Sequence, residues 1–445
     1  MNLRNNPTRW LKCLFMLTVL SVTGSTAHAQ LSSREKRVAA YVDEQNQGAL
    51  RLWEEIVNMN SGTMNFEGVY RVGKLLQTQF EALGFATRWV DGKAFNRSGH
   101  LIAEHKGKGK TILLIGHLDT VFELSSPFQK FTSVNDSTVS GPGVADMKGG
   151  DVVMISSLQA LKKAGLLQDM NLIVVLSGDE ELSGEPLSLA RQDLIEAAKR
   201  ADIALGFENG DGIFETANIS RRSSSDWELK VSGVASHSSQ IFTEKVGVGA
   251  IFEASRILNN FYESLSGEPN LTFNAGVILG GDSIAYDPNQ NGGNAYGKGN
   301  VVPQEAIVTG DIRALTPEQL QKVQEVMMNV VEDHHPKAQA EIKFYEGYPP
   351  LAPTPGNYQL LGQFDQVSRD LGYGSVTAVN PRDAGAADIS FTSGYVDMAM
   401  DGLGPRSMGS HTIHETADPR TLSMQSKRVA ILLYRLTREN KLDQR

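Results

Sequence analysis

At residues 111–119 the chain reads TILLIGHLD, an apolar run that ends on a histidine and an aspartate. The run is short and continuous, which predicts a strand that is buried on both faces of a sheet. His117 and Asp119 would then lie just beyond the carboxyl end of that strand. In an open sheet of parallel strands, ligands bind at this end.

Two further runs of the same kind follow along the chain. Residues 171–177 read NLIVVLS, and residues 202–207 read DIALGF. We expect helices over 147–164 and 184–199, which would separate these strands. Strands that alternate with helices predict a mostly parallel sheet covered by helices, so this part of the chain is assigned to the α/β class.

The pattern changes after residue 222. Strands and helices are expected in the order β-α-β-β-α-β, which is the split unit of ferredoxin-like α+β domains. A Gly- and Asn-rich stretch between Gly280 and Asn300 interrupts this order. We expect it to be a loop, which is long enough to be functional or mobile. The six elements are expected at 227–234, 246–264, 271–279, 301–312, 317–333 and 340–346.

We therefore predict a catalytic domain in two parts, 30–222 and 349–445, with a lid domain inserted between them at 223–348. The proline-rich sequence PPLAPTP at 349–355 marks the return from the lid to the catalytic domain. One more apolar strand is expected near 396–400.

The first 29 residues have the composition of a secretory signal peptide. Three basic residues precede an apolar run at 14–22, and Ala27-His28-Ala29 fits a cleavage site after Ala29. The apolar run is too short to span a bilayer. A signal peptide predicts a periplasmic or secreted protein. Its removal would also remove Cys13, the only cysteine, so no disulfide is expected.

The net charge of the chain excludes two classes of binding partner. The chain of 445 residues has a net charge of −9, and loss of the three basic residues in the signal would make it −12. An acidic protein is a poor ligand for nucleic acid or for an anionic membrane, so neither is expected as a partner. The hydrophobic content of 40% is ordinary for a globular protein.

Potential metal ligands follow each of the three predicted strands. His117 follows the first strand, residues 178–181 (GDEE) follow the second, and Glu208 follows the third. Asp146 lies just before the predicted helix at 147–164. Imidazole nitrogen and carboxylate oxygen suit Zn²⁺, and two zinc ions need a bridging carboxylate. The residue types at these positions fit that arrangement.

Four sequence blocks together resemble the signature of the aminoacylase and glutamate carboxypeptidase family of co-catalytic zinc exopeptidases. Within that family, the chain is most similar to the bacterial glutamate carboxypeptidases. The blocks occur in the family's order and cover nearly all of the chain after the signal. They are HLDTVF at 117–122, GVADMKGG at 143–150, GDEE at 178–181 and HTIHE at 411–415.

The resemblance implies a role for each matching position. Two zinc ions per subunit would share Asp146 as a bridge, with Glu181 on one ion and Glu208 on the second. His117 would bind one of the ions, and His411 would complete the second. Asp119 would orient the imidazole of His117, and Glu180 would act as the general base. The five implied ligands are His117, Asp146, Glu181, Glu208 and His411.

Met147 departs from the family pattern, and His414 is an alternative to His411 as a metal ligand. Family members often carry a second acid after the bridging aspartate, where this chain has Met147. Since the first acid is the bridge, we expect no effect on the metal. His414 lies close to His411, but only His411 has a glutamate four residues later, as the family has. The family also implies a non-proline cis peptide bond between Asp146 and Met147.

The resemblance extends into the predicted lid. His237, in SGVASHS at 232–238, would reach the active site of the partner subunit and help to hold the oxyanion. Asn274 would contact the substrate, and Arg313 would bind the substrate's free carboxylate with its guanidinium. A homodimer formed through the lid domain is implied as well.

Other polar residues carry weaker signals. Arg382 lies in a Gly- and Ala-rich region, 382–388, which resembles a substrate-binding turn of the family. Lys298 and Arg382 could favour an acidic side chain in the substrate, although loop residues of this kind are usually solvated. Four histidines lack ligand spacing and are expected on the surface: His100, His105, His334 and His335.

These features predict a secreted di-zinc metallopeptidase. It would hydrolyse the amide bond next to a free C-terminal carboxylate, in peptides or N-acyl amino acids. An aminoacylase or a dipeptidase of the same fold would use the same metal chemistry with a different pocket. A non-catalytic binding protein is a further alternative, but it would have no need of Glu180 beside a complete ligand set.

Overall fold

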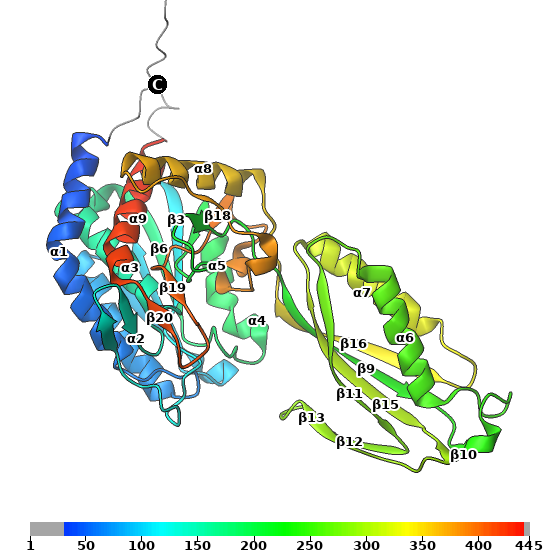
Figure 1. Cartoon of the computed structure of the whole chain (residues 1–445). Helices are drawn as coiled ribbons and strands as arrows, with labels where there is room; N and C mark the ends of the chain where they lie inside the picture. The colour runs from blue at the N-terminus through cyan, green and yellow to red at the C-terminus, as the bar shows by residue number, and fades with distance from the viewer. Residues whose placement is uncertain (1–30, 440–445) are drawn as a thin grey trace, which may run out of the picture. The chain divides into compact units, whose positions relative to one another are not determined.

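The computed structural model describes residues 31–439 (Figure 1). The predicted signal peptide, 1–29, and its cleavage point after Ala29 lie outside the described residues. Within the described range, every helix is too short or too polar to cross a membrane.

A six-stranded sheet forms the centre of the larger part of the chain, in the order β1-β2-β6-β3-β7-β18 (Figure 1). The last four strands in this order run parallel, and β1 and β2 form an antiparallel edge. The predicted mostly parallel sheet is therefore confirmed. The strands are β1 (Ala86–Asp91), β2 (Gly99–His105), β3 (Lys108–His117), β6 (Met170–Ser177), β7 (Ile203–Gly206) and β18 (Met398–Met400).

Helices cover both faces of this sheet, as the side chains of β3 show. Ile112 and Leu114 point into a core shared with α1, α2, α3, α8 and α9, whereas Leu113 and Ile115 point into a second core that includes α5. Burial on both faces is the reason that the strand is apolar at successive positions. The helices are α1 (Ser33–Val57), α2 (Phe66–Leu83), α3 (Lys148–Lys163), α5 (Gln192–Ala198), α8 (Pro355–Asp370) and α9 (Pro419–Glu439).

The helix predicted over 184–199 is instead two short helices, α4 (Leu187–Ala190) and α5. Arg191 separates them with φ −103° and ψ 3°. Its guanidinium is buried and forms ion pairs with Asp179 and Asp388. The apolar periodicity of residues 184–199 predicts one continuous helix, because these ion pairs do not affect that pattern.

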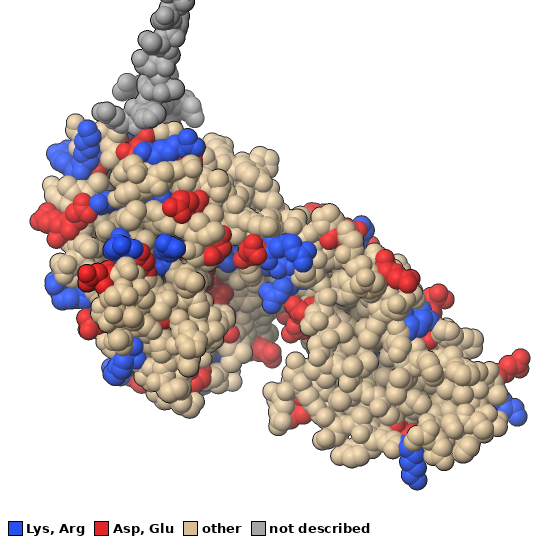
Figure 2. Space-filling model, viewed as in Figure 1, with Lys and Arg blue, Asp and Glu red and all other residues tan. Residues whose placement is uncertain are grey.

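Residues 224–348 form a second, antiparallel sheet in the order β11-β15-β9-β16, with two helices packed on one face (Figure 1). The element order is the predicted β-α-β-β-α-β. The face of this domain that is turned to the viewer in Figure 2 carries few charged side chains. Its elements are β9 (Ser224–Ser232), α6 (Gly249–Leu265), β11 (Thr272–Gly281), β15 (Glu305–Arg313), α7 (Pro317–Glu332) and β16 (Gln339–Tyr348).

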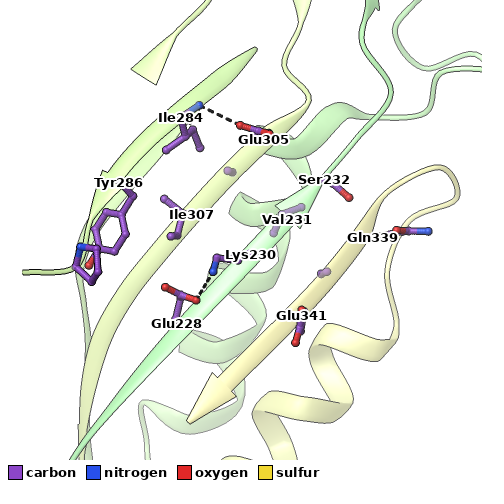
Figure 3. Close-up of a pocket in the computed structure, with 13 residues that line it drawn as sticks. Glu228, Lys230, Val231, Ser232, Ile284, Tyr286, Glu305, Ile307, Gln339 and Glu341 are labelled. Atoms are coloured by element: carbon purple, nitrogen blue, oxygen red, sulfur yellow. Dashed lines mark hydrogen bonds and ion pairs between the residues drawn. The ribbon is translucent and has the colours of Figure 1, made fainter. Parts of the chain in front are cut away.

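The stretch from Gly280 to Asn300, expected to be a loop, contains a hairpin of β12 (Ser283–Asp287) and β13 (Gly292–Tyr296). A groove of about 620 Å³ lies between this hairpin and the open face of the lid sheet (Figure 3). Glu305 accepts a hydrogen bond from the backbone N–H of Ile284 at its rim. Three acidic side chains line the groove (Glu228, Glu305 and Glu341), but none of them belongs to a described group that could hold a metal ion.

Shorter strands complete the described part of the chain. Of these, β10 and β14 pair in the lid, and β19, β20, β5 and β4 form a small sheet. Their bounds are β4 (Thr132–Asn135), β5 (Thr138–Ser140), β8 (Thr216–Ala217), β10 (Ser236–His237), β14 (Val301–Val302), β17 (Thr377–Ala378), β19 (Ser407–Met408) and β20 (Thr416–Ala417).

Candidate metal centre

The carboxyl ends of three neighbouring strands bring polar side chains to one edge of the central sheet. His117 is the last residue of β3, Glu181 lies in the loop after β6, and Glu208 follows β7. These strands are adjacent and parallel in the order β6-β3-β7, so their carboxyl ends meet. The edge is therefore the one at which the sequence placed potential ligands.

Asp146 reaches the same edge from the loop before α3. The buried carboxylate of Glu415 holds this loop by accepting hydrogen bonds from three of its backbone N–H groups. The peptide bond between Asp146 and Met147 is cis, as the family resemblance implied. The three donors are Gly143 at 3.2 Å, Ala145 at 2.7 Å and Asp146 at 3.1 Å.

Two groups of side chains share Asp146. His117 Nε2 lies 3.1 Å from Asp146 Oδ1 and 3.3 Å from Glu208 Oε1. His411 Nε2 lies 3.1 Å from Asp146 Oδ2 and 3.1 Å from Glu181 Oε2. Each group offers three atoms that could hold one metal ion, and the two oxygens of Asp146 serve different groups. The expectation that His411 shares an ion with Glu208 was wrong, because Glu208 follows the strand beside β3 and its carboxylate pairs with His117 instead. A shared carboxylate of this kind is typical of two-metal sites.

The electrostatics of the two groups fit a pair of cations. Burial and the negative charge of Asp146 raise the pKa of Glu208 to about 8. Burial and the same charge raise the pKa of Glu181, whose buried Oε1 has no hydrogen-bond partner among the described residues. Carboxylates that repel one another in a buried site are stabilised by a metal ion. The donor set of nitrogen and oxygen therefore fits two divalent cations.

Asp119 lies behind His117 and is fully buried. The Nδ1 atom of His117 lies 3.1 Å from the backbone oxygen of Asp119 and 3.4 Å from its carboxylate. A proton on Nδ1 would leave the Nε2 lone pair directed toward Asp146 and Glu208. The Asp119 carboxylate also accepts the hydroxyl of Thr63 at 2.6 Å.

Glu180 lies beside these groups, but its carboxylate belongs to neither of them. Burial raises the pKa of Glu180 well above its usual range, and the charge of Glu208 adds to this effect while that of His117 opposes it. A carboxylate that is close to a metal site but not bound to the metal is suited to proton transfer.

Asp401 is a residue that the sequence reasoning missed. It is fully buried and follows β18 directly. Its Oδ1 accepts the backbone N–H of Glu208 at 3.2 Å, and its Oδ2 pairs with Arg221 at 2.9 Å. Its position directly after a strand, like that of the predicted ligands, is a signal that could have indicated Asp401. Glu415 carried a signal too, since it stands four residues after His411.

Of the two neighbouring histidines in HTIHE, only His411 joins the described metal-binding groups. The backbone of His411 has φ 64°, in the left-handed region where a residue with a side chain is strained. Such strain is found where function requires a particular orientation. The side chain of His414 is exposed.

The structure places the three predicted lid residues outside the two metal-binding groups. His237 lies on β10, where its Nδ1 is 2.9 Å from the hydroxyl of Ser239. Arg313 ends β15, and its Nε donates to Asp311 at 3.0 Å. Asn274 pairs with Asp311 across β11 and β15, and both line a groove of about 470 Å³. Asn274 and Arg313 therefore share one end of the lid sheet.

Three guanidinium groups gather near this end. Arg222 is buried, and it donates to the hydroxyl of Thr272 at 2.7 Å and to the backbone oxygen of Arg382 at 2.8 Å. Burial and the charges of Arg313 and Arg382 lower the pKa of Arg222, an effect that two nearby aspartates offset in part. Its Nε has no hydrogen-bond partner among the described residues. Guanidinium groups held together in this way favour an anionic ligand.

His100 is buried, so the expectation that it lies on the surface was wrong. Its Nδ1 accepts the backbone N–H of Gly178 at 3.2 Å, its Nε2 lies 2.9 Å from the carbonyl oxygen of Ala190, and its ring stacks on Phe95. Burial lowers the pKa of His100, which favours the neutral ring. Of the other three histidines, His105 is half-buried, and His334 and His335 are exposed as expected.

Comparison with known proteins adds an independent line of support. The family model described as Peptidase family M20/M25/M40 matches residues 113–435. Carboxypeptidase G2 from Pseudomonas sp. (strain RS-16) is 25% identical over 425 residues, which are 92% of this chain and 96% of that protein.

Solved structures share the fold. Aminopeptidase PepT from Bacillus cereus ATCC 10987 matches with a TM-score of 0.68 and 18% identity, over 88% of this chain and 98% of that one. A dinuclear metal-binding peptidase of the M20 family from Bacillus subtilis matches with a TM-score of 0.60 and 16% identity, over 88% and 99% of the two chains.

Proposed function

The chain belongs to peptidase family M20/M25/M40, and we propose that it is a secreted di-zinc carboxypeptidase that releases a C-terminal residue from peptides or N-acyl amino acids. Membership of this family makes the protein a metallo-exopeptidase. The observation that carries the proposal is the sharing of Asp146 between two groups of potential ligands.

The proposed metal is zinc, with two ions per subunit. His117, Asp146 and Glu208 would hold one ion, and Asp146, Glu181 and His411 the other. A set of imidazole and carboxylate donors without thiolate suits zinc in catalytic sites. When bound, the two ions supply Lewis acidity toward a water molecule and toward the scissile carbonyl.

Glu180 is the proposed general base. It would accept a proton from the attacking water and return it to the amine that leaves, which completes hydrolysis of the amide bond. Asp119 would act indirectly, because it touches both His117 and the backbone of Glu180. Its proposed role is to keep the two side chains in fixed positions.

Recognition of a free carboxylate is proposed for Arg313, with Asn274 as a second substrate contact. The guanidinium of Arg313 is one third exposed, at 36%, and lies near the guanidinium groups of Arg222 and Arg382. The positive charges of these three arginines support the proposal that an anionic group of the substrate binds at this end of the lid sheet. A planar guanidinium can bind both oxygens of a carboxylate at once.

We also propose a homodimer through the lid, in which His237 reaches the active site of the partner and helps to hold the oxyanion. Apolar side chains exposed on and beside α6 support such an interface. Phe242 is 66% exposed, Phe252 is 57% exposed, and their rings lie 5.7 Å apart. The edge strand β11 adds Ile278, which is 55% exposed.

Secretion is proposed from the N-terminal sequence alone. The protein recovered from the periplasm or the medium should begin at Gln30, which mass spectrometry of the intact chain can establish. A recovered protein that still carries the apolar run at 14–22 would contradict removal of a signal peptide.

A substrate panel tests the proposed activity. It contains N-acyl amino acids, N-blocked dipeptides and free dipeptides, each as the free acid and as the C-terminal amide, with zinc-loaded and chelated enzyme. We expect zinc-dependent turnover of the free acids only. Preference for free dipeptides would favour a dipeptidase, and preference for simple N-acyl amino acids an aminoacylase.

The panel also tests the role of Arg313. Charged hydrogen bonds contribute about 1.5–3 kcal/mol, so Arg313→Ala should raise KM for the free acids by about 10- to 100-fold. Lys343→Ala, an exposed lysine on β16, is the control and should leave KM unchanged. Equal turnover of acids and amides would rule out carboxylate recognition, and binding without turnover of any substrate would rule out the peptidase proposal.

A further inference from the structure

Four hydrogen bonds hold the two peptide groups on either side of the Glu180 Cα atom. Asp119 accepts both N–H groups, each at 3.1 Å. On the opposite side, Arg191 Nη2 donates to the carbonyl oxygen before Glu180 at 3.0 Å, and the hydroxyl of Tyr348 donates to the carbonyl oxygen of Glu180 at 3.0 Å. Each of the two peptide groups is therefore held at its N–H and at its C=O.

This arrangement fixes the direction in which the Glu180 side chain leaves the backbone. A peptide group is planar, so holding both of its ends fixes the orientation of its plane. The two planes that flank a Cα atom determine φ and ψ, and with them the direction of the Cα–Cβ bond. A misplacement of about 1 Å in a reacting group can lower a rate about 100-fold.

We propose that Arg191 and Tyr348 are positioning residues for Glu180, forming the half of a backbone clamp that lies opposite Asp119. This inference rests on the proposed role of Glu180 as general base. It adds two residues that lie outside the family's signature blocks, and it assigns them a specific action, which is to hold the carbonyl side of the two peptide groups.

The contacts of Arg191 suit this role. The side chain is 1% exposed, and its Nη1 pairs with Asp179 at 2.7 Å while its Nε pairs with Asp388 at 2.8 Å. Its Nη2 also donates to the hydroxyl of Tyr348 at 2.5 Å. Buried ion pairs contribute little net stability, because desolvation offsets the attraction between the charges. Their rigid geometry supports a positioning role, because the planar guanidinium holds several partners in fixed positions at once.

Tyr348 reaches Glu180 from a different part of the chain. It is the last residue of β16, the strand that leads from the lid sheet back to the catalytic domain. Its ring packs edge-on against Phe391 at 5.0 Å, and the guanidinium of Arg191 lies 5.4 Å from the ring centre. The hydroxyl is thereby aimed at the carbonyl oxygen of Glu180. The orientation of the proposed base thus depends on the end of a lid strand.

Tyr348→Phe is the sharpest test, because it removes one hydroxyl and preserves the ring. We expect kcat on the best substrate to fall about 10- to 100-fold, with KM and zinc content unchanged. In the zinc-free protein, amide hydrogen exchange of the segment 178–184 should become faster, since the loop loses one of its anchors. Arg191→Lys keeps the charge but loses the planar fork, and it should change kcat and exchange in the same direction.

A control variant separates positioning from a general effect of removing a tyrosine hydroxyl. Tyr345→Phe makes the same chemical change at an exposed position on the same strand. This variant should keep kcat and hydrogen exchange within twofold of the parent protein.

The outcomes distinguish this inference from the proposed function. Glu180→Gln is measured in parallel and should abolish turnover while zinc remains bound. If Glu180→Gln is inactive but Tyr348→Phe keeps its kcat and its hydrogen exchange, the clamp is wrong and the base assignment stands. An equal loss of kcat in Tyr345→Phe would also overturn the clamp. If Glu180→Gln stays active, the proposed function itself fails.

Discussion

Glu415 lies outside the two described metal-binding groups but holds the loop that carries Asp146. Its carboxylate accepts three backbone N–H groups of the loop that carries Asp146. We expect Glu415→Gln to weaken zinc binding about 10- to 100-fold, which is the usual effect of losing a partner that orients a ligand. Titration against a chelator of known affinity measures this change.

The matched control for this prediction is Glu185→Gln. Glu185 lies in the loop after β6, which carries two of the proposed site residues, but its side chain is exposed. The control should bind zinc as tightly as the parent protein. Unchanged zinc affinity in Glu415→Gln would show that the loop holds Asp146 in place without Glu415.

Individual site residues differed in how well the sequence could predict them. His117 is the last residue of β3, and Glu208 follows the end of β7 by two residues. The apolar pattern of the two strands was therefore enough to predict that both side chains lie at one edge of the sheet. Tyr348 and Glu180 are 168 residues apart, and their hydrogen bond leaves no trace in any local pattern. His100 was misplaced for a related reason, because its burial depends on Phe95, Gly178 and Ala190 together.

Helices α1 and α9 are joined by a charged pair that makes their packing depend on pH. Arg435 on α9 donates to Glu35 on α1 at 2.7 Å and to Asp370 on α8 at 2.7 Å. Burial alone would raise the pKa of Glu35, but hydrogen bonds from Arg435 and Ser32 lower it below the usual 4.5. The pair therefore stabilises the folded state above about pH 4.5, and this contribution is lost as the pH falls through the lowered pKa.

Glu35→Gln should lower the free energy of unfolding by about 1 kcal/mol at pH 7, allowing for screening by solvent. The difference from the parent protein should shrink below pH 4.5, where the parent loses the same charge. Thermal unfolding from pH 7 to pH 3 measures it. Glu54→Gln, an exposed position on the same helix, is the control. A difference that persists unchanged at pH 3 would contradict the assigned charge pair.

Secondary structure was predicted well where the apolar pattern was strong and poorly where contacts between distant segments decide it. The buried strand at 111–116 and the helix at 147–164 were expected close to where β3 and α3 lie. The break at Arg191 between α4 and α5 was not, because it accompanies ion pairs to distant segments. The hairpin of β12 and β13 is not predicted by the sequence, because its Gly and Asn residues have a low preference for strands.

The proposed homodimer can be tested by measuring the mass of the protein in solution. Light scattering should give a mass of twice the chain, and Phe252→Glu on α6 should give the monomer, because a buried charge opposes association. Tyr358→Glu on α8 is the control at a similarly exposed position. A parent protein that is monomeric at micromolar concentration would contradict the dimer.

The dimer also predicts complementation between two inactive variants. His237→Ala and Glu180→Gln homodimers should each have little activity. Mixed dimers contain one complete site of two, in which His237 comes from the other subunit. Random exchange of equal amounts makes about half of the dimers mixed, so about a quarter of the parent activity should return. No recovery after verified exchange would show that His237 does not act across the subunits.

Two zinc ions that share Asp146 should both be visible by anomalous X-ray scattering at the zinc edge. Crystals of the zinc-loaded protein should show two peaks, one bounded by His117, Asp146 and Glu208 and the other by Asp146, Glu181 and His411. Crystals of Asp146→Ala should lose both peaks or retain weak ones. A single peak, or peaks that do not contact Asp146, would show that Asp146 does not bridge two metal ions.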